Sequence, residues 1–136
     1  ALQTIAVGPD VDAGVTMRIL IAEDNAAIRM MVHHVLESEG HEVIVAENGL
    51  EALQRALLHQ PDGVVLDGSM PIMDGWEVCK RIKAQRNIPV MMLTVHAERT
   101  DRERAEECGA DEFLAKPFDI ADLVAKVNAL LSRAVS

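Results

Sequence analysis

Five short apolar runs, separated by longer segments with helical periodicity, constrain the fold of this chain more than any other feature. The runs cover residues 18–23, 42–46, 63–67, 90–94 and 112–115. Apolar runs of this length, bounded by Gly, Pro, Asn or Asp, are typical of buried parallel strands. Strands that alternate with helices are joined by right-handed crossovers, with helices on both faces of the sheet. The sequence therefore predicts a three-layer α/β sandwich.

The segments between the runs carry the start and stop signals of helices. In the first of them, apolar side chains recur at helical spacing from Ile28 to Leu36, and Gly40 ends the pattern. Asp74 has the position of an N-cap, and Thr100 begins a sequence with capping-box form. We expect helices over about residues 26–39, 48–59, 74–84, 100–108 and 119–132.

Length and composition indicate one ordinary globular domain. The chain has 136 residues, 49% apolar and 26% charged, which is enough for a single core. Its net charge of −9 argues against direct binding to nucleic acid, which requires clustered Lys and Arg. No apolar stretch has the length of a transmembrane helix, and the start lacks a secretory pattern. We expect a cytoplasmic protein that does not bind membranes.

The first residues and the two cysteines have conventional interpretations. Residues 1–16 show no amphipathic period, and Met17 directly precedes the first strand. We expect 1–16 to be a disordered N-terminal extension or an expression remnant, and 17–136 to form the domain. Cys79 and Cys108 lack metal-ligand spacing, so we expect reduced thiols and not a disulfide.

Charged side chains stand where three of the predicted strands end. Glu23 and Asp24 come at the end of the first, Asp67 ends the third and Lys116 follows the fifth. Because ligands bind at the carboxyl ends of strands in open α/β sheets, we expect these four side chains to meet. Carboxylates about 5 Å apart, at an effective dielectric of about 20, repel by roughly 3 kcal/mol per pair. Such a cluster needs a cation.

The types of side chain in the cluster indicate which cation and which anionic ligand fit it. Oxygen ligands without His or Cys nearby favour Mg²⁺, or alternatively Mn²⁺, over zinc. A phosphoryl group suits the remaining groups, since a carboxylate can accept it while the Thr94 hydroxyl and the Lys116 ammonium hold its oxygens. Neither a Gly-x-Gly-x-x-Gly nor a Gly-Lys-Ser/Thr loop is present, which disfavours nucleotide sites of those kinds.

Four motifs stand in order at the ends of the first, third, fourth and fifth predicted strands. They are Ile21-Ala22-Glu23-Asp24-Asn25, Leu66-Asp67-Gly68-Ser69-Met70-Pro71-Ile72-Met73-Asp74-Gly75, Met92-Leu93-Thr94 and Phe113-Leu114-Ala115-Lys116-Pro117-Phe118. Together they make the chain similar to the receiver domains of bacterial two-component response regulators, from Met17 to about Val135. The resemblance implies a flavodoxin-like, doubly wound sheet with strand order 2-1-3-4-5.

The same resemblance implies a role for each residue of the acidic cluster. Asp67 would be the phosphoacceptor and also a metal ligand. Asp24 would bind Mg²⁺ directly, Glu23 would act through water, and the main-chain carbonyl of Ser69 would be a further ligand.

The resemblance also implies how the signal is read. Thr94 and Lys116 would hold the phosphoryl oxygens, and a cis Lys116–Pro117 peptide would aim the lysine. Phe113 would be the switch aromatic that turns inward when the Thr94 hydroxyl is captured by the phosphoryl group, changing the surface of the fourth helix, fifth strand and fifth helix. Val95, His96 and Ser69 stand at the mouth of the site, and we expect them to set the lifetime of the phosphoryl group.

The partners implied are a sensor histidine kinase or phosphotransfer protein as donor, and a downstream protein or an output domain outside this sequence as receiver of the signal. A homodimer formed on phosphorylation is a further option. The chain is expected to phosphorylate and dephosphorylate itself without being an enzyme that turns over a substrate.

Two other function classes and one open question remain at this point. A haloacid-dehalogenase-type phosphatase would need a second carboxylate where Ser69 stands, and an unphosphorylated interaction module would not need the complete set of site residues. The fourth helix, 100–108, is highly charged and offers little beyond Ala105 and Cys108 to bury. Our hypothesis is that it shifts on phosphorylation; the alternative is a solvated helix without a switching role.

Overall fold

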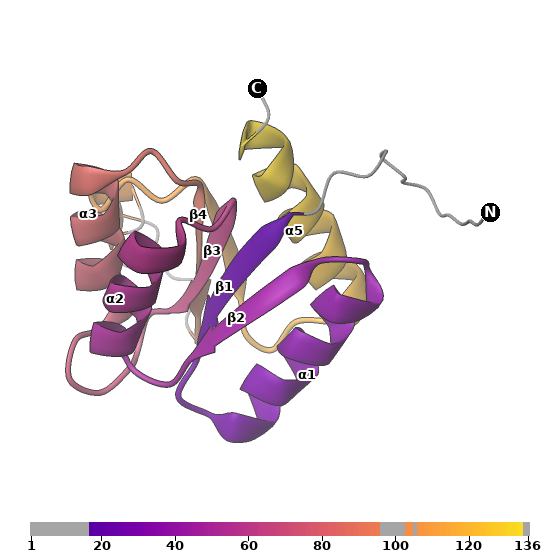
Figure 1. The fold of residues 1–136 in the computed structure, drawn as a ribbon. Coiled ribbons are helices and arrows are strands. Elements are labelled where there is room, and N and C mark those ends of the chain that lie inside the picture. The colour runs from indigo at the N-terminus through magenta and orange to yellow at the C-terminus, as the bar shows by residue number, and fades with distance from the viewer. Residues whose placement is uncertain (1–16, 96–102, 105, 135–136) are drawn as a thin grey trace.

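A five-stranded parallel sheet forms the centre of the molecule. The computed structural model describes residues 17–95, 103–104 and 106–134. The strands are β1 (Arg18–Ala22), β2 (Glu42–Ala46), β3 (Gly63–Asp67), β4 (Val90–Thr94) and β5 (Glu112–Ala115), and the helices are α1 (Ala26–Ser38), α2 (Gly49–His59), α3 (Gly75–Gln85) and α5 (Ile120–Ala134). The strand order is β2-β1-β3-β4-β5, which confirms the predicted topology (Figure 1).

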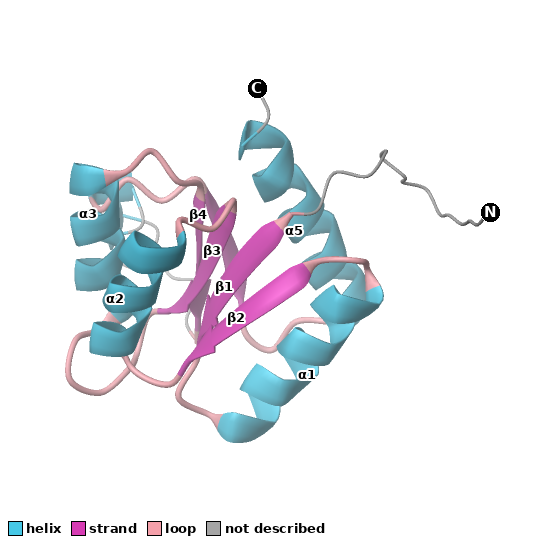
Figure 2. Ribbon diagram, viewed as in Figure 1, coloured by secondary structure: helices cyan, strands magenta, loops and turns pink. Residues whose placement is uncertain are grey.

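Helices cover both faces of the sheet, with α1 and α5 on one face and α2 and α3 on the other (Figure 2). Successive side chains of a strand point to opposite faces. In β1, Leu20 packs with the α2 and α3 side, whereas Ile19 and Ile21 pack with the α1 and α5 side. Because β1, β3 and β4 are buried on both faces, their sequences are apolar, apart from one polar residue at an end of each strand, instead of alternating. The core is therefore two apolar layers separated by the sheet.

The register of the strands brings their carboxyl ends to one edge. Ala22 of β1 lies opposite Leu66 of β3, and Asp67 lies opposite Leu93 of β4. Thr94 in turn lies opposite Ala115 of β5. The residues that follow these strands are consequently neighbours at this edge, as the sequence predicted.

Side-chain caps start the helices close to the predicted positions. The side chains of Asn25, Asn48 and Asp74 each accept a backbone N–H three residues on, at the starts of α1, α2 and α3. Asp119 does the same for the Asp122 N–H, so α5 begins at Ile120. The predicted N-cap at Asp74 is confirmed.

The remaining differences from the predicted elements are small. β1 ends at Ala22, one residue early, and α5 continues to Ala134. Cys79 and Cys108 are free and buried, as expected. Residues 1–16 and His96 lie outside the described residues, as do residues 100–102 and 105 of the predicted fourth helix. Residues 103–104 and 106–107 of that helix are helical. None of the described helices is both long and apolar enough to cross a lipid bilayer.

Candidate functional site

Three carboxylates meet at the carboxyl edge of the sheet. Each of Glu23, Asp24 and Asp67 offers an oxygen atom within 4.8 Å of the others. Glu23 and Asp67 are buried, with 1% and 3% of their surface exposed, whereas Asp24 faces solvent. Carboxylates this close repel strongly in a partly desolvated site. The site therefore has an open, acidic mouth above two buried acids.

Lys116 supplies a positive charge that contacts the two buried acids. Its ammonium nitrogen lies 2.8 Å from Oε1 of Glu23 and 3.5 Å from Oδ1 of Asp67. The Lys116 N–H donates to the carbonyl of Thr94 at 2.6 Å, which fixes the lysine backbone against β4. The Lys116–Pro117 peptide is cis, as the family resemblance implied.

One lysine does not neutralise the cluster. Burial, followed by a hydrogen bond shared with the Glu23 carboxyl, raises the pKa of Asp67 to about 7. The Ser69 N–H, which donates to Oδ1 of Asp67 at 3.2 Å, and the nearby Lys116 charge oppose this shift. Oε1 of Glu23 has the lysine ion pair but accepts no hydrogen bond of regular geometry. A further cation would satisfy both buried acids.

The loop after β3 is held tightly against α3. The Gly75 N–H donates to the Gly68 carbonyl at 3.1 Å. A Cβ atom on Gly75 would lie 2.1 Å from the backbone oxygen of Asp67, a distance that no side chain could occupy without moving the chain. Gly75 is thus required where α3 meets the backbone of Asp67.

The other predicted site residues lie around the acids in different ways. Thr94 is 4% exposed at the end of β4 and lines a hollow of about 360 Å³ together with Asp67 and Ser69. Phe113 is half-buried and packs against the core layer on the α2 and α3 side. The structure therefore brings six of the predicted site residues to one edge of the sheet: Glu23, Asp24, Asp67, Ser69, Thr94 and Lys116. Phe113 lies in β5, in the core layer and not at this edge.

A second hollow, of about 590 Å³, opens over the acids on the α1 side. The three carboxylates and Lys116 are among its polar lining, and Ile28, Met31 and Phe118 are among its apolar lining. Oxygen ligands with an open, solvent-facing side suit Mg²⁺, which keeps several of its waters or phosphate oxygens. Chemically, the carboxylates of Glu23, Asp24 and Asp67 fit such an ion.

One basic residue near the acids was not predicted from the sequence. Arg29 donates from Nη1 to the carbonyl oxygen of Glu23 at 2.8 Å, and its Nη2 lies 3.8 Å from Oε2 of Glu47. It therefore holds the backbone of Glu23 from α1. The sequence did contain a signal for this contact. Arg29 stands four residues after Asn25, the cap of α1, and this spacing places it on the first turn of the helix, close to Glu23.

Curated relatives with similar sequences are full-length regulators. The transcriptional regulatory protein PdtaR of Mycobacterium tuberculosis is 42% identical over 125 residues, which are 91% of this chain and 61% of that protein. The alkaline phosphatase synthesis transcriptional regulatory protein PhoP of Bacillus subtilis is 39% identical over 117 residues, covering 85% of this chain and 49% of that protein. The chain thus spans about half to three-fifths of the length of these relatives.

Solved structures with the same fold match over nearly their whole length. Chemotaxis protein CheY4 of Vibrio cholerae is 32% identical with a TM-score of 0.82, covering 86% of this chain and 100% of that one. The receiver domain of a sensor histidine kinase from Pseudomonas aeruginosa, solved with a magnesium ion coordinated in its active-site cleft, is 30% identical with a TM-score of 0.80. That match covers 87% of this chain and 99% of the solved one.

A family model supports the same conclusion. The model described as the response regulator receiver domain matches residues 19–128, which include all of β1 except Arg18, the acidic cluster and most of α5. With the strand order, the site residues and the similar proteins in agreement, this chain belongs to the receiver domain family of two-component response regulators.

Proposed function

We propose that this chain accepts a phosphoryl group on Asp67 in a reaction that depends on Mg²⁺ held by Glu23, Asp24, Asp67 and the carbonyl of Ser69. The observation that carries the proposal is the buried Asp67 carboxylate, one of three acids within 4.8 Å of one another and 3.5 Å from the Lys116 ammonium. Bound Mg²⁺ would offset the charge of the acids and of the phosphoryl oxygens. Mn²⁺ offers the same oxygen chemistry.

Asp67, Lys116 and Thr94 have different roles in the proposed phosphoryl transfer. An oxygen of ionised Asp67 attacks the phosphorus of a phosphohistidine donor and forms the O–P bond. The P–N bond breaks, and the imidazole nitrogen keeps the electron pair and takes a proton. Lys116 and the Thr94 hydroxyl bind phosphoryl oxygens, which holds the group in line. Because Asp67 must be ionised to attack, its raised pKa makes a bound cation important at neutral pH.

The phosphoryl donor that suits this chemistry is a sensor histidine kinase or a phosphotransfer protein. The partner that binds the phosphorylated surface is a downstream protein, an output domain or a second copy of the chain. Thr94 and Phe113 would pass the change to the surface around β5 and α5. The chain would catalyse its own phosphorylation and dephosphorylation without turning over a separate substrate. We place this activity in the cytoplasm, without direct contact to nucleic acid or membrane.

The decisive experiment is intact mass spectrometry after incubation with Mg²⁺ and acetyl phosphate. We expect the wild type to gain one phosphoryl group and Asp67→Asn to gain none. Asp24→Asn should reduce the gain and raise the Mg²⁺ concentration required, because it removes one metal ligand. Asp122→Asn is the matched control, since this acid lies exposed on α5, outside the site. A wild type that gains no phosphoryl group would refute the proposal.

A further inference from the structure

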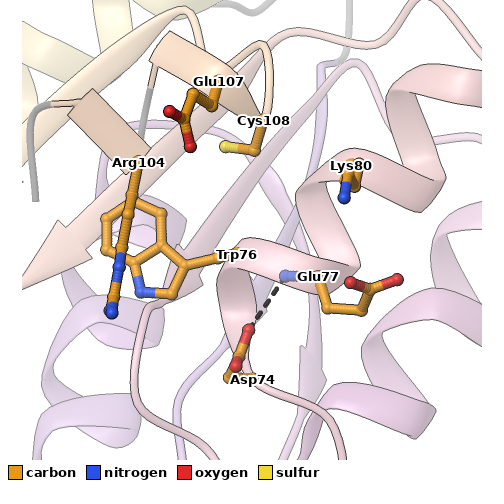
Figure 3. A pocket seen from close by; sticks show the side chains of 7 residues that line it. All are labelled: Asp74, Trp76, Glu77, Lys80, Arg104, Glu107 and Cys108. Atoms are coloured by element: carbon orange, nitrogen blue, oxygen red, sulfur yellow. Dashed lines mark hydrogen bonds between the residues drawn. The ribbon is translucent and has the colours of Figure 1, made fainter.

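Arg104 and Trp76 line two hollows, one of which contains Asp67. The other hollow, of about 310 Å³, is lined by Asp74, Trp76, Glu77, Lys80, Arg104, Glu107 and Cys108 (Figure 3). Arg104 also lines the 360 Å³ hollow that contains Asp67 and Thr94, whereas Lys80 does not. Its side chain is therefore a basic group of the 103–108 segment that shares a hollow with the phosphoacceptor.

The guanidinium of Arg104 rests on the indole ring of Trp76. Its central carbon lies 6.0 Å from the ring centroid, and Figure 3 shows the side chain crossing the ring. At an exposed position such a contact is worth only about 0.5–1 kcal/mol. The arginine can consequently leave the ring when a stronger anion is available within its reach.

Trp76 itself lies against the backbone next to the phosphoacceptor. A Cβ atom on Gly68 would lie 3.1 Å from three atoms of the indole, so the ring covers the residue that follows Asp67. Trp76 is half-buried, and it is the single tryptophan of the chain. The ring thus connects the phosphoacceptor loop to Arg104 and can report optically on their contact.

The net charge of the proposed site changes when Asp67 is phosphorylated. With Mg²⁺ bound, the three ionised acids and Lys116 bring the site to neutrality. Arg29 does not alter this balance because Glu47 lies beside it. An acyl phosphate carries about two negative charges in place of the single charge of the carboxylate, so the site gains one uncompensated negative charge. The phosphorylated site therefore attracts a further cation, which the unphosphorylated site does not.

Building on the proposed function, we infer that Arg104 is a movable counter-charge that leaves Trp76 and pairs with the phosphoryl group on Asp67. Arginine suits this role because its planar guanidinium both stacks on aromatic rings and forms paired hydrogen bonds with phosphate oxygens. The movement draws the 103–108 segment toward the site and uncovers the indole. Arg104 is thereby a direct counter-charge to the phosphoryl group in the phosphorylated state.

The fluorescence of Trp76 tests this inference. Wild type, Arg104→Ala, Arg104→Lys and Lys80→Ala are treated with Mg²⁺ and either acetyl phosphate or beryllofluoride, a phosphoryl mimic. Intact mass gives the phosphorylated fraction, so that fluorescence is expressed per phosphorylated molecule. In the wild type and Lys80→Ala we expect a red shift and stronger acrylamide quenching on phosphorylation. Arg104→Ala should show this exposed spectrum before treatment and no further shift.

Affinity for beryllofluoride gives a second readout that a merely structural role would not move. We expect Arg104→Ala to bind it about fivefold more weakly, as for the loss of a solvent-exposed charge pair. Arg104→Lys should recover most of that affinity but not the resting fluorescence, because lysine keeps the charge and loses the planar stack.

The outcomes separate the inference from the function on which it rests. If the wild type is phosphorylated but Trp76 does not respond, or if Arg104→Ala responds and binds beryllofluoride like the wild type, the inference is wrong and the proposed function stands. If the wild type neither gains a phosphoryl group nor binds beryllofluoride, both are refuted.

Discussion

The acidic site and the 103–108 segment both lie close to Trp76, but they are held in opposite ways. Glu23, Asp67 and Thr94 are between 1% and 4% exposed, at the ends of three paired strands. In the 103–108 segment, the described side chains at 103, 104, 106 and 107 are exposed and charged, and Cys108 is buried.

Under the proposed function, this difference fits a division of labour between phosphoryl transfer at the site and its readout by the segment. Phosphoryl transfer requires groups that are fixed before the reaction, and strand ends in a buried sheet supply such groups. An element that responds to the transfer must instead move at low free-energy cost, as a segment with little buried apolar surface can. Substitutions on the two sides should therefore differ in kind, with global effects at the site and local effects in the segment.

The largest effect should come from filling the contact between α3 and the Asp67 backbone. Gly75→Ala places a methyl group 2.1 Å from the backbone oxygen of Asp67, and we expect a loss of about 3 kcal/mol in unfolding free energy. Gly40→Ala is the control. Gly40 has a φ of +93°, but no atom lies within 4 Å of the position that a Cβ would take, so only conformational strain of about 1 kcal/mol applies. Equal losses in urea denaturation would show that the site backbone is not specially constrained.

The second effect concerns the pH dependence of stability in metal-free protein. The folded-state pKa of Asp67, about 7, lies above its unfolded value of 3.8, so the native state binds more protons between these values. The stabilising contribution of Asp67 protonation is then fully present below about pH 4, and this contribution is lost as the pH rises through about 7. The full shift corresponds to about 4 kcal/mol; local relaxation and water reduce the expected loss to about 2 kcal/mol.

Asp67→Asn and Mg²⁺ provide the tests of this pH effect. In Asp67→Asn the decline between pH 4 and pH 8 should largely disappear in denaturation curves, because no carboxylate is left to ionise at that position. Saturating Mg²⁺ should restore stability to the wild type at pH 8 and have little effect on the variant. A wild type whose stability rises steadily over this range would contradict the assignment of a raised pKa to Asp67.

The third effect is a gain of stability in the loop after β3. Ile72 has a φ of +73° and is 75% exposed, although a β-branched residue is strained in this conformation. Ile72→Gly should stabilise the protein by about 1 kcal/mol because the strain exceeds the entropy that glycine adds to the unfolded chain. Leu58→Gly is the control at similar exposure, 74%, but inside α2, where glycine should destabilise by about 1 kcal/mol. If both variants lose stability in urea denaturation, Ile72 carries no releasable strain.

The sheet and its acidic edge were predictable from the sequence because their signals are local. Each buried strand is a continuous apolar run, and parallel topology brings the ends of such runs together, so Glu23, Asp67 and Lys116 could be grouped before any contact was known. The caps at Asn25 and Asp74 follow from residue type and position in the same way. Which acid accepts the phosphoryl group came from the family resemblance and stays a prediction.

The contacts around Trp76 could not be predicted in the same way. Arg104 belongs to a segment in which nearly every side chain is charged, so periodicity gives no direction for any one of them. Its contact with Trp76 depends on how the segment packs against α3, which involves residues far apart in the sequence. Contacts of long flexible side chains at such separations are determined by tertiary structure alone.

The smallest global effect, and the most local one, is expected at Cys108. This residue is 7% exposed, and its carbonyl accepts a hydrogen bond from the Cys79 thiol of α3 at 3.4 Å, so it attaches the segment to the core. Cys108→Ala keeps this carbonyl and removes only the buried thiol, so it should lower the unfolding free energy by only about 0.5 kcal/mol. It should also accelerate hydrogen exchange at the amides of Cys108 and Gly109, which donate to the carbonyls of Arg104 and Glu106. Cys79→Ala, at a fully buried position in α3, removes the thiol donor of that hydrogen bond as well as core volume, so it should in addition reduce protection across β3 and β4. Should Cys108→Ala reduce protection of the strands as much as Cys79→Ala does, the segment would be part of the same cooperative unit as the site, and a phosphoryl group on Asp67 could not move it independently.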